Sequence, residues 1–147
     1  MAWRLLDEGG GRRTFALVLQ TGDEAMAAVE ALARDQALDA AQIAGSAAFS
    51  EAVLRYFDWA DKSYHDIPVA EQVEVASLIG DIAAGEDGRP VVHIHLVLGR
   101  RDGSAPASHL KRGVVRPTLE LIVTESPAHL RRRHDPQSGL ALIALQA

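Results

Sequence analysis

Apolar and polar residues alternate along most of the chain, and one segment instead repeats them at helical spacing. Strand side chains point alternately to two faces, whereas helix side chains share a face every three or four residues. Together with continuous apolar runs of strand length, the alternation predicts strands over residues 3–6, 14–20, 50–58, 71–83, 91–98, 118–125 and 140–145. Connections of hairpin length join most of these strands, which favours antiparallel pairing.

The sequence pattern of residues 21–38 predicts the main helix. Thr21 or Asp23 can cap its first N–H groups, and acidic residues suit the positive end of the helix dipole. One apolar face repeats at helical spacing through Met26, Val29, Leu32, Ala33 and Ala37. This face is expected to pack on the sheet.

A second, short helix is predicted over residues 128–133. Ser126 would be its cap and Pro127 its first residue, which is the preferred order at a helix start. The chain is therefore expected to form one domain over residues 1–147 of the α+β class. Its sheet should be mainly antiparallel or mixed, packed by one long helix and a short C-terminal helix.

Two glycines in apolar segments indicate close approach of backbones. Gly45 lies among small residues in the segment 41–49, where it permits a bend or a close contact. Gly80 interrupts the predicted strand 71–83, where it marks a bulge or a close approach.

The strand 91–98 carries the clearest candidate chemistry. His93 and His95 are two residues apart, so both imidazoles point to one face, about 6–7 Å apart at the backbone. His109 follows a loop of small residues and can return to that face. Three imidazoles suit zinc or a similar divalent metal. The alternative is a pair of histidines hydrogen-bonded at a subunit contact or on a polar sheet face.

Two acids are candidates for supporting roles at these histidines. Glu74 lies on the strand expected to pair with the histidine strand through the turn 85–88, so its carboxylate can orient an imidazole. An exposed surface carboxylate is the alternative interpretation of Glu74. Glu120 lies on the strongly alternating strand 118–125 and is the other candidate.

Composition narrows the chemistry and the location. The chain of 147 residues has no cysteine, so a metal must bind to histidines and carboxylates. No apolar run reaches the ~18–20 residues of a membrane span, and no signal-peptide pattern begins the chain. The expected location is the cytoplasm, with no membrane partner.

Charge is unevenly distributed along the chain. The formal net charge is −5, which argues against tight unaided binding to DNA. Residues 89–134 nevertheless carry nine basic and three acidic side chains, including the run Arg131, Arg132 and Arg133. This run is a candidate anion-binding surface, and solvated surface charge is the alternative.

The predicted strands offer more apolar surface than the helices can cover. A helix of about 15 residues is about 22 Å long, enough for part of one sheet face. Because large exposed apolar patches usually mark interfaces, the other face should bind further copies of the chain. The residues assigned to that face are Val53, Val73, Val75, Ile94, Leu121 and Val123.

Several short motifs, in this order, resemble the PPC (plants-and-prokaryotes-conserved) domain family over nearly the whole chain. They are Ile43-Ala44-Gly45-Ser46-Ala47-Ala48, Tyr56-Phe57-Asp58, Val73-Glu74-Val75, Leu78-Ile79-Gly80, Gly88-Arg89-Pro90, His93-Ile94-His95, His109-Leu110 and Thr118-Leu119-Glu120. The resemblance implies an α+β fold that assembles as a homotrimer. It also implies the three-histidine metal site of some prokaryotic members, here His93, His95 and His109.

The sequence departs from the family pattern at two places. Ala107-Ser108 stands where the family usually has Gly-Gly before the third histidine. Plant members carry a separate AT-hook with the core Arg-Gly-Arg-Pro, and this chain has Asp87-Gly88-Arg89-Pro90. An acid replaces an arginine that would enter the minor groove, so the segment is interpreted as a turn.

Two functions follow from these features. The first is a free-standing trimeric interaction or regulatory module, associated with DNA or protein, that holds a divalent metal, zinc by preference. The second is a zinc-dependent enzyme, in which three neutral imidazoles leave a position where the metal activates water. Glu74 or Glu120 would then be the general base.

Overall fold

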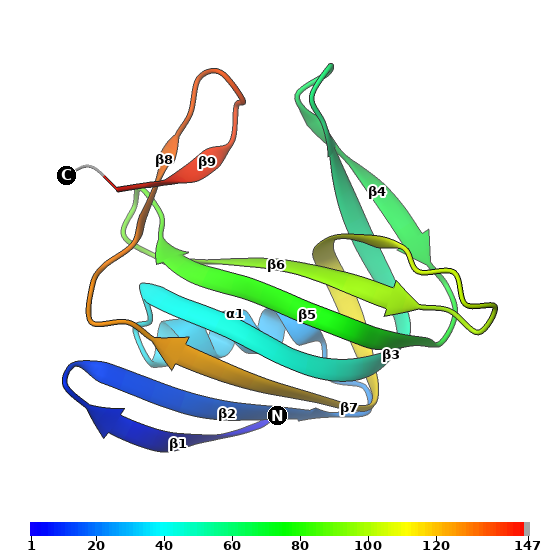
Figure 1. Ribbon diagram of the computed structural model, residues 1–147, viewed down its shortest axis with the longest axis horizontal. Helices are drawn as coiled ribbons and strands as arrows, with labels where there is room; N and C mark the ends of the chain where they lie inside the picture. The colour runs from blue at the N-terminus through cyan, green and yellow to red at the C-terminus, as the bar shows by residue number, and fades with distance from the viewer. Residues whose placement is uncertain (146–147) are drawn as a thin grey trace.

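The computed structural model describes residues 1–145 and consists of one curled sheet and one helix (Figure 1). The elements in chain order are β1 Ala2–Gly9, β2 Arg12–Gln20, α1 Ala25–Asp35, β3 Ala40–Asp58, β4 Ser63–Val69, β5 Val73–Ala84, β6 Pro90–Gly99, β7 Ala107–Glu125, β8 Arg131–His134 and β9 Ala141–Ala144. The predicted α+β class with a mainly antiparallel, mixed sheet is confirmed, because among the strand pairs of residues 1–145 only β5–β8 is parallel.

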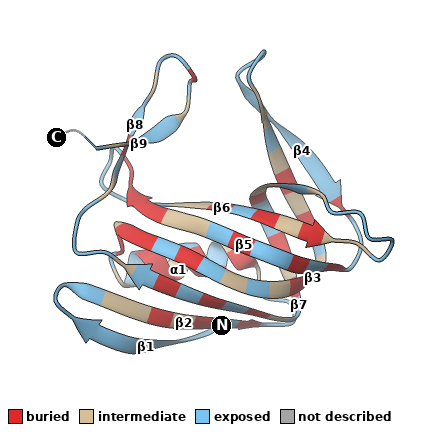
Figure 2. Cartoon of the chain, viewed as in Figure 1, coloured by how far each residue is buried: buried red, intermediate tan, exposed pale blue. Residues whose placement is uncertain are grey.

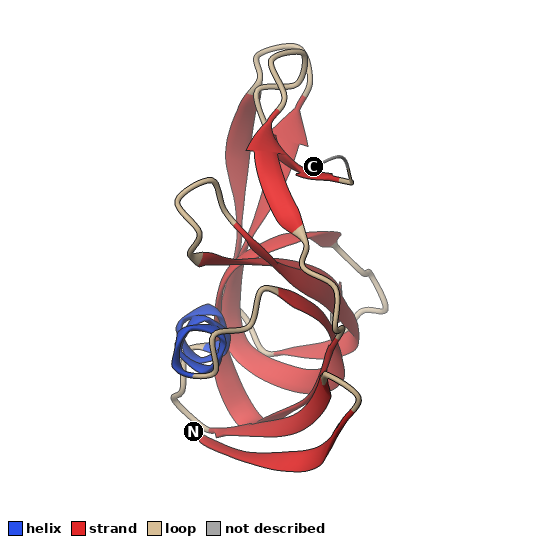
Figure 3. Cartoon of the chain, turned by 90° about the vertical axis from the view of Figure 1, so that its left-hand side faces the viewer, coloured by secondary structure: helices blue, strands red, loops and turns tan. Residues whose placement is uncertain are grey.

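Two long strands curl the sheet. β3 and β7 have 19 residues each and pair along most of their length, with register shifts at several points. The C-terminal half of β7 pairs with β2, whereas its first residues pair with β6. β7 therefore pairs with β2 through one half and with β6 through its first residues. The strands wrap around a common interior (Figure 3).

The interior is filled from the inner face of the sheet and from one side of α1. Buried residues alternate with more exposed ones along the first half of β5 and the second half of β6 (Figure 2), as expected for strands with one face in the core. From the helix, Val29 and Leu32 are fully buried, and they belong to the same core cluster as Phe15 and Leu17 of β2. Burial of such side chains stabilises the fold by about 1.5–3 kcal/mol each.

The helix is shorter than predicted, and its cap differs. It has 11 residues and begins after Glu24, whose carboxylate accepts hydrogen bonds from the N–H groups of Met26 and Ala27. Asp23, a predicted cap, instead accepts from the N–H of Gln20 and pairs with the N-terminal amine. The helix lacks the length and apolar character needed to cross a bilayer.

The predicted C-terminal helix is wrong. Residues 131–134 form strand β8, in which Arg132 is buried and its two arginine neighbours are exposed. The chain is held extended because the N–H of Ser126 donates to the carbonyl of Ala40 and the N–H of Ala84 donates to that of Leu130. Hydrogen bonds to the edge of the sheet therefore override the local helix-start signal. β9, predicted as a buried strand over residues 140–145, is mostly exposed.

The apolar face assigned to a partner lies instead in the chain's own core. Five of its six residues are buried, and Val53 is half-buried. A register shift between Val75 and Ser77 separately breaks the predicted alternation of this strand, because it turns Leu78 inward and Ile79 outward. The five buried residues are Val73, Val75, Ile94, Leu121 and Val123.

The predicted close approaches at glycines are confirmed. A Cβ atom on Gly80 would lie 2.4 Å from the carbonyl oxygen of His93, and one on Gly45 would lie 2.1 Å from that of Glu120. Both distances are far below van der Waals contact. Gly80 thus lets β6, the strand that carries His93 and His95, lie tightly against β5.

Candidate metal centre

The three predicted histidines meet on the outer face of the sheet. His93 and His95 point away from the core on β6, since Ile94 between them is buried. His109 is directly opposite His95 in the pairing of β6 with β7. Ser108 is one of the two residues that replace the Gly-Gly usual in the family. It lies within β7 and donates a hydrogen bond to the carbonyl of Arg55. The backbone of β7 is therefore extended at this point and brings His109 to its neighbours.

The geometry of these three residues, which we call the histidine cluster, suits one metal ion. One ring nitrogen from each residue can be chosen so that all three lie within 4.8 Å of one another. The ring centroids of His95 and His109 are 3.9 Å apart, and His93 lies 4.9 Å and 5.0 Å from them. Tetrahedral zinc, with Zn–N bonds of about 2.0–2.1 Å, needs nitrogens roughly 3.4 Å apart. Small ring rotations would reach that spacing.

Hydrogen bonds orient two of the rings toward a common point. Nδ1 of His93 lies 3.1 Å from a carboxylate oxygen of Asp81, and Nδ1 of His109 lies 3.3 Å from the carbonyl oxygen of Arg55. Both acceptors require a proton on Nδ1, so Nε2 of each ring keeps its lone pair. This is the arrangement that metal-binding histidines usually have.

The surroundings favour the neutral form of two of the imidazoles, those of His109 and His95. Burial, together with the neighbouring His95 and His93, lowers the pKa of His109 to about 4. Burial and the charge of His93 also lower the pKa of His95. Neutral imidazole is the form that binds metals, so these rings need lose no proton near pH 7.

Asp81 is the acid at the histidine cluster, and sequence reasoning missed it. It lies opposite His93 in the β5–β6 pairing. Burial raises the pKa of Asp81, but hydrogen bonds from His93 and Arg132 outweigh this effect and hold the pKa below its usual value. Counting the register back from the turn at residues 85–89 would have identified this pair, because hairpin partners lie symmetrically about the turn.

The acids chosen from the sequence lie elsewhere on the sheet. Glu74 pairs in register with Gly99, at the far end of β5 from Asp81. Glu120 lies on the C-terminal half of β7, opposite Ser46 of β3. Within residues 1–145, no hydrogen bond or ion pair joins either carboxylate to the histidine cluster.

The three consecutive arginines have different surroundings. Arg131 and Arg133 are exposed, and Arg132 is buried against Asp81. All three line a cavity of about 240 Å³ together with Gly85 and Glu86. The surface proposed for anions therefore contains two exposed arginine side chains and one that is buried and paired with Asp81.

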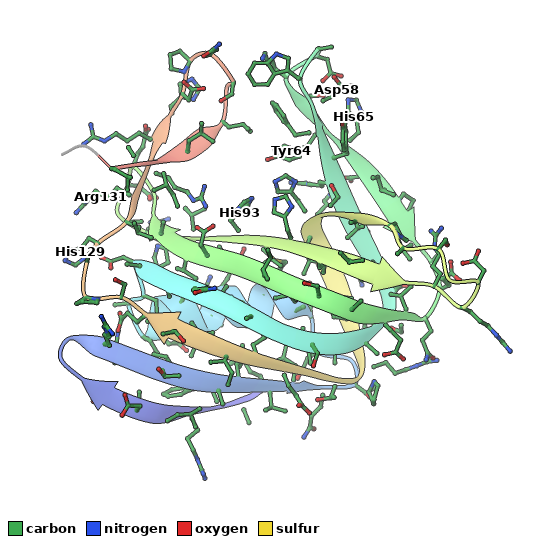
Figure 4. All side chains as sticks on the ribbon, in the orientation of Figure 1. Asp58, Tyr64, His65, His93, His129 and Arg131 are labelled. Carbon is green, nitrogen blue, oxygen red and sulfur yellow. The ribbon has the colours of Figure 1, made fainter. Side chains whose placement is uncertain are left out.

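A second group of potential ligands occupies the tip of the β3–β4 hairpin. Asp58, Asp61 and His65 also offer three atoms within 4.8 Å of one another, and we call them the hairpin cluster. Asp61 accepts hydrogen bonds from the N–H and hydroxyl of Ser63 and lies 2.7 Å from Nε2 of His65. Figure 4 shows His93 between this hairpin and the β8–β9 hairpin, well away from Asp58 and His65.

A cavity adjoins one side of the histidine cluster. It measures about 410 Å³, and His95 and His109 line it with mainly apolar neighbours. Tyr56 and Phe57 contribute aromatic walls from β3. Tyr64 packs edge-on against His109, with ring centroids 5.3 Å apart. An apolar cavity that opens on candidate metal ligands is the usual form of a small-molecule site.

The model of the Plants and Prokaryotes Conserved (PCC) domain matches residues 6–127. The chain belongs to this family. The match confirms the resemblance found in the sequence motifs, and it ends before β8, so the PCC match does not include the β8–β9 hairpin. No curated protein matches the chain.

Solved structures of PCC-like proteins share the fold. A plant- and prokaryote-conserved protein from Pyrococcus horikoshii has a TM-score of 0.83 and 27% identity, over 92% of this chain and 93% of its own. A candidate DNA-binding protein from Bacteroides thetaiotaomicron has a TM-score of 0.84 and 25% identity, over 97% and 96%. A metal-containing protein from Archaeoglobus fulgidus has a TM-score of 0.83 and 28% identity, over 98% and 99%.

Proposed function

We propose that this PCC protein is a homotrimeric interaction or regulatory module that holds one divalent metal ion on the histidine cluster. The observation that carries the proposal is the set of three outward-facing imidazoles, two of which have Nδ1 bound to an acceptor and Nε2 free. Zinc suits an all-nitrogen site and is the proposed metal. The similar protein from Archaeoglobus fulgidus, described as metal-containing, supports the proposal.

Elemental analysis tests the metal. Protein purified without an affinity tag should contain up to one zinc or similar ion per chain. A chelator should remove the ion, and added zinc should restore it. Protein that stays metal-free after dialysis against zinc would refute the proposal.

The trimer is supported by an apolar row on the outer face of the sheet. In the strand pairing, Ala16, Ile122, Ala44 and Ile79 follow one another across four strands, and His95 is next. Ile122 is 45% exposed and Ile79 is 58% exposed. Such a continuous apolar row is typical of an interface, and the histidine cluster lies at its end.

Sedimentation equilibrium at micromolar concentration tests the trimer. Wild type should have three times the chain mass, and Ile122→Lys should dissociate because a charge enters the interface. Leu142→Lys is the matched control, since Leu142 is 44% exposed on β9 and lies off the row. A wild-type monomer would refute the assembly.

The cavity beside the histidine cluster favours a second candidate function, a zinc-dependent enzyme. A metal on three histidines retains an open position and would supply Lewis-acid chemistry there. Neither Glu74 nor Glu120 lies in a described contact with the cluster, so their role as general base stays a prediction. Zinc-dependent hydrolysis of activated aryl or phosphate esters that His95→Ala abolishes would favour the enzyme. No turnover by the zinc-loaded protein favours the module.

Binding to DNA is proposed only as a weak, nonspecific interaction. The relative from Bacteroides thetaiotaomicron is described as a candidate DNA-binding protein. In this chain, however, Arg89 lies at the end of a tight turn, in which its carbonyl accepts a hydrogen bond from Gly85. That geometry belongs to the β5–β6 hairpin, and it leaves no extended arginine hook.

A further inference from the structure

The β8–β9 hairpin, residues 131–144, extends from the end of β5 near Asp81, the residue that contacts His93. It lies outside the residues that match the family, and Figure 1 shows it opposite the β3–β4 hairpin. Its turn is internally braced, because Asp135 accepts hydrogen bonds from the N–H and hydroxyl of Ser138. These hydrogen bonds hold the turn of the hairpin in one conformation.

Arg132 joins this hairpin to the sheet. Its side chain is 9% exposed, and it donates from one terminal nitrogen to the carbonyl of Ala141 at 3.0 Å. The other terminal nitrogen donates to a carboxylate oxygen of Asp81 at 2.6 Å. The guanidinium thus connects β9 with β5 across the base of the hairpin. A buried arginine in two such contacts has a fixed orientation.

Asp81 connects Arg132 with a ligand of the metal site. One carboxylate oxygen accepts from Arg132, and the other lies 3.1 Å from Nδ1 of His93. Because both oxygens are used as acceptors, the carboxylate plane is fixed from both sides. His93 must then carry its proton on Nδ1 and offer Nε2 to the metal.

We propose that Arg132 is a positioning residue, through which the β8–β9 hairpin sets the affinity of the histidine cluster for metal. It holds Asp81, and Asp81 in turn fixes the tautomer and rotation of His93. This inference rests on the proposed metal function. Hydrogen-bonding partners of metal ligands typically change metal affinity by 10–100-fold, and Arg132 acts one contact further out.

Zinc competition against a chromophoric chelator tests the proposal on the full chain. Arg132→Gln should weaken zinc binding about 10-fold, and Arg132→Lys should restore part of the loss because lysine keeps a charged donor. Arg131→Gln is the matched control. It removes the same charge from the same strand, at an exposed position, and should leave the affinity within about twofold.

A tautomer measurement separates positioning from general stability. In the metal-free protein, imidazole nitrogen shifts of His93 should show Nδ1–H in wild type and a mixture of tautomers in Arg132→Gln. Asp81→Asn gives a second variant. Its amide has one acceptor oxygen, so when Arg132 takes it the NH₂ group faces His93, favours the opposite tautomer and weakens zinc binding at least as strongly.

The outcomes distinguish this inference from the proposed function. A wild-type chain that binds no zinc overturns both. The positioning role alone is overturned if the wild-type chain binds one zinc and a folded Arg132→Gln variant keeps both the zinc affinity and the His93 tautomer of wild type. If Arg132→Gln does not fold, Asp81→Asn decides, and zinc affinity equal to that of wild type there refutes the proposal.

Discussion

The histidine cluster and the hairpin cluster have the same ligand spacing and very different surroundings. Each brings three potential ligand atoms within 4.8 Å. In the histidine cluster, hydrogen bonds occupy Nδ1 of His93 and His109 and leave the other ring nitrogen free. In the hairpin cluster, Ser63 and His65 occupy both carboxylate oxygens of Asp61.

The supports of the two clusters also differ. The histidine cluster lies on β6 and β7 over a packed core, where Ile94 and Leu110 are buried. The hairpin cluster lies at an exposed turn, and the side chains of Asp61 and His65 are 49% and 55% exposed. A metal site needs free lone pairs on a rigid frame as well as proximity. By this criterion only the histidine cluster qualifies.

Removing ligands should give the largest difference between the clusters. We expect His93→Ala and His109→Ala each to reduce bound zinc from one per chain to nearly none, because two imidazoles bind far more weakly than three. Mass-spectrometric metal analysis of tag-free protein measures this content.

Asp61→Asn is the control for the ligand variants, and it should keep the full zinc content. If it loses zinc while His109→Ala retains it, the comparison of the two clusters is reversed.

The rigid frame under the histidine cluster can be tested at Gly80. We expect Gly80→Ala to lower the free energy of unfolding by about 2 kcal/mol, because overpacking of this kind typically costs 1–3 kcal/mol. The added methyl would lie 2.4 Å from the carbonyl oxygen of His93. Urea denaturation monitored by circular dichroism provides the measurement.

Gly99→Ala is the matched control on the same strand pair. Its Cβ would have no neighbour closer than 3.7 Å, so the change should stay within about 0.5 kcal/mol. Equal effects at Gly80 and Gly99 would show that the close approach is not tight.

The low pKa of His109 predicts a pH dependence that the hairpin cluster should not influence. The pKa of His109 is about 4 when folded and about 6.5 when unfolded, so only the unfolded chain binds this proton between those values. The metal-free protein should therefore lose stability as pH falls from about 6.5 to about 4. Aspartates with lowered pKa, such as Asp81, contribute below that window.

Thermal unfolding at a series of pH values measures the effect of His109. His109→Gln should show a shallower decrease of Tm across this window, whereas Asp61→Asn should show the wild-type slope there. An unchanged slope in His109→Gln would contradict the depressed pKa.

The smallest expected effect concerns the charge on the two hairpins that flank the histidine cluster. Arg131 and Arg133 are exposed on β8, whereas Asp58 and Asp61 lie at the tip of the β3–β4 hairpin. Any DNA contact should therefore favour β8. Neutralising Arg131 and Arg133 should reduce the weak, salt-dependent binding and lower its salt slope by up to about 2.

Fluorescence anisotropy over a range of salt concentrations measures the DNA interaction. Arg132 is left unchanged in this experiment, because its side chain is paired with Asp81. Tight, sequence-specific binding at physiological salt would contradict the expectation of weak binding.

The sequence predicted local features of the fold well. Alternation alone placed His93 and His95 on the outer face of one strand, and the turn at residues 85–89 follows from its glycines and acids. The single amphipathic helix was also found, although its end lies at Asp35. These features depend on neighbouring residues, which a sequence displays directly.

Features set by distant contacts were missed. Arg132 was predicted in a helix, but pairing of β8 with β9 and with the end of β5 makes it part of a strand beside Asp81. The curl of the sheet was also missed, and it buries within the chain the apolar face that the sequence assigned to a partner. The role of Asp81 required the register of two strands, because its partner His93 lies 12 positions further along the chain.

The most direct test of the account is a crystal structure of the zinc-soaked protein, with anomalous data collected at the zinc absorption edge. We predict one peak per chain, bound by Nε2 of His93, Nε2 of His109 and a ring nitrogen of His95 at about 2.0–2.1 Å. A peak at the hairpin cluster, or no peak beside a fully hydrogen-bonded set of three histidines, would contradict it.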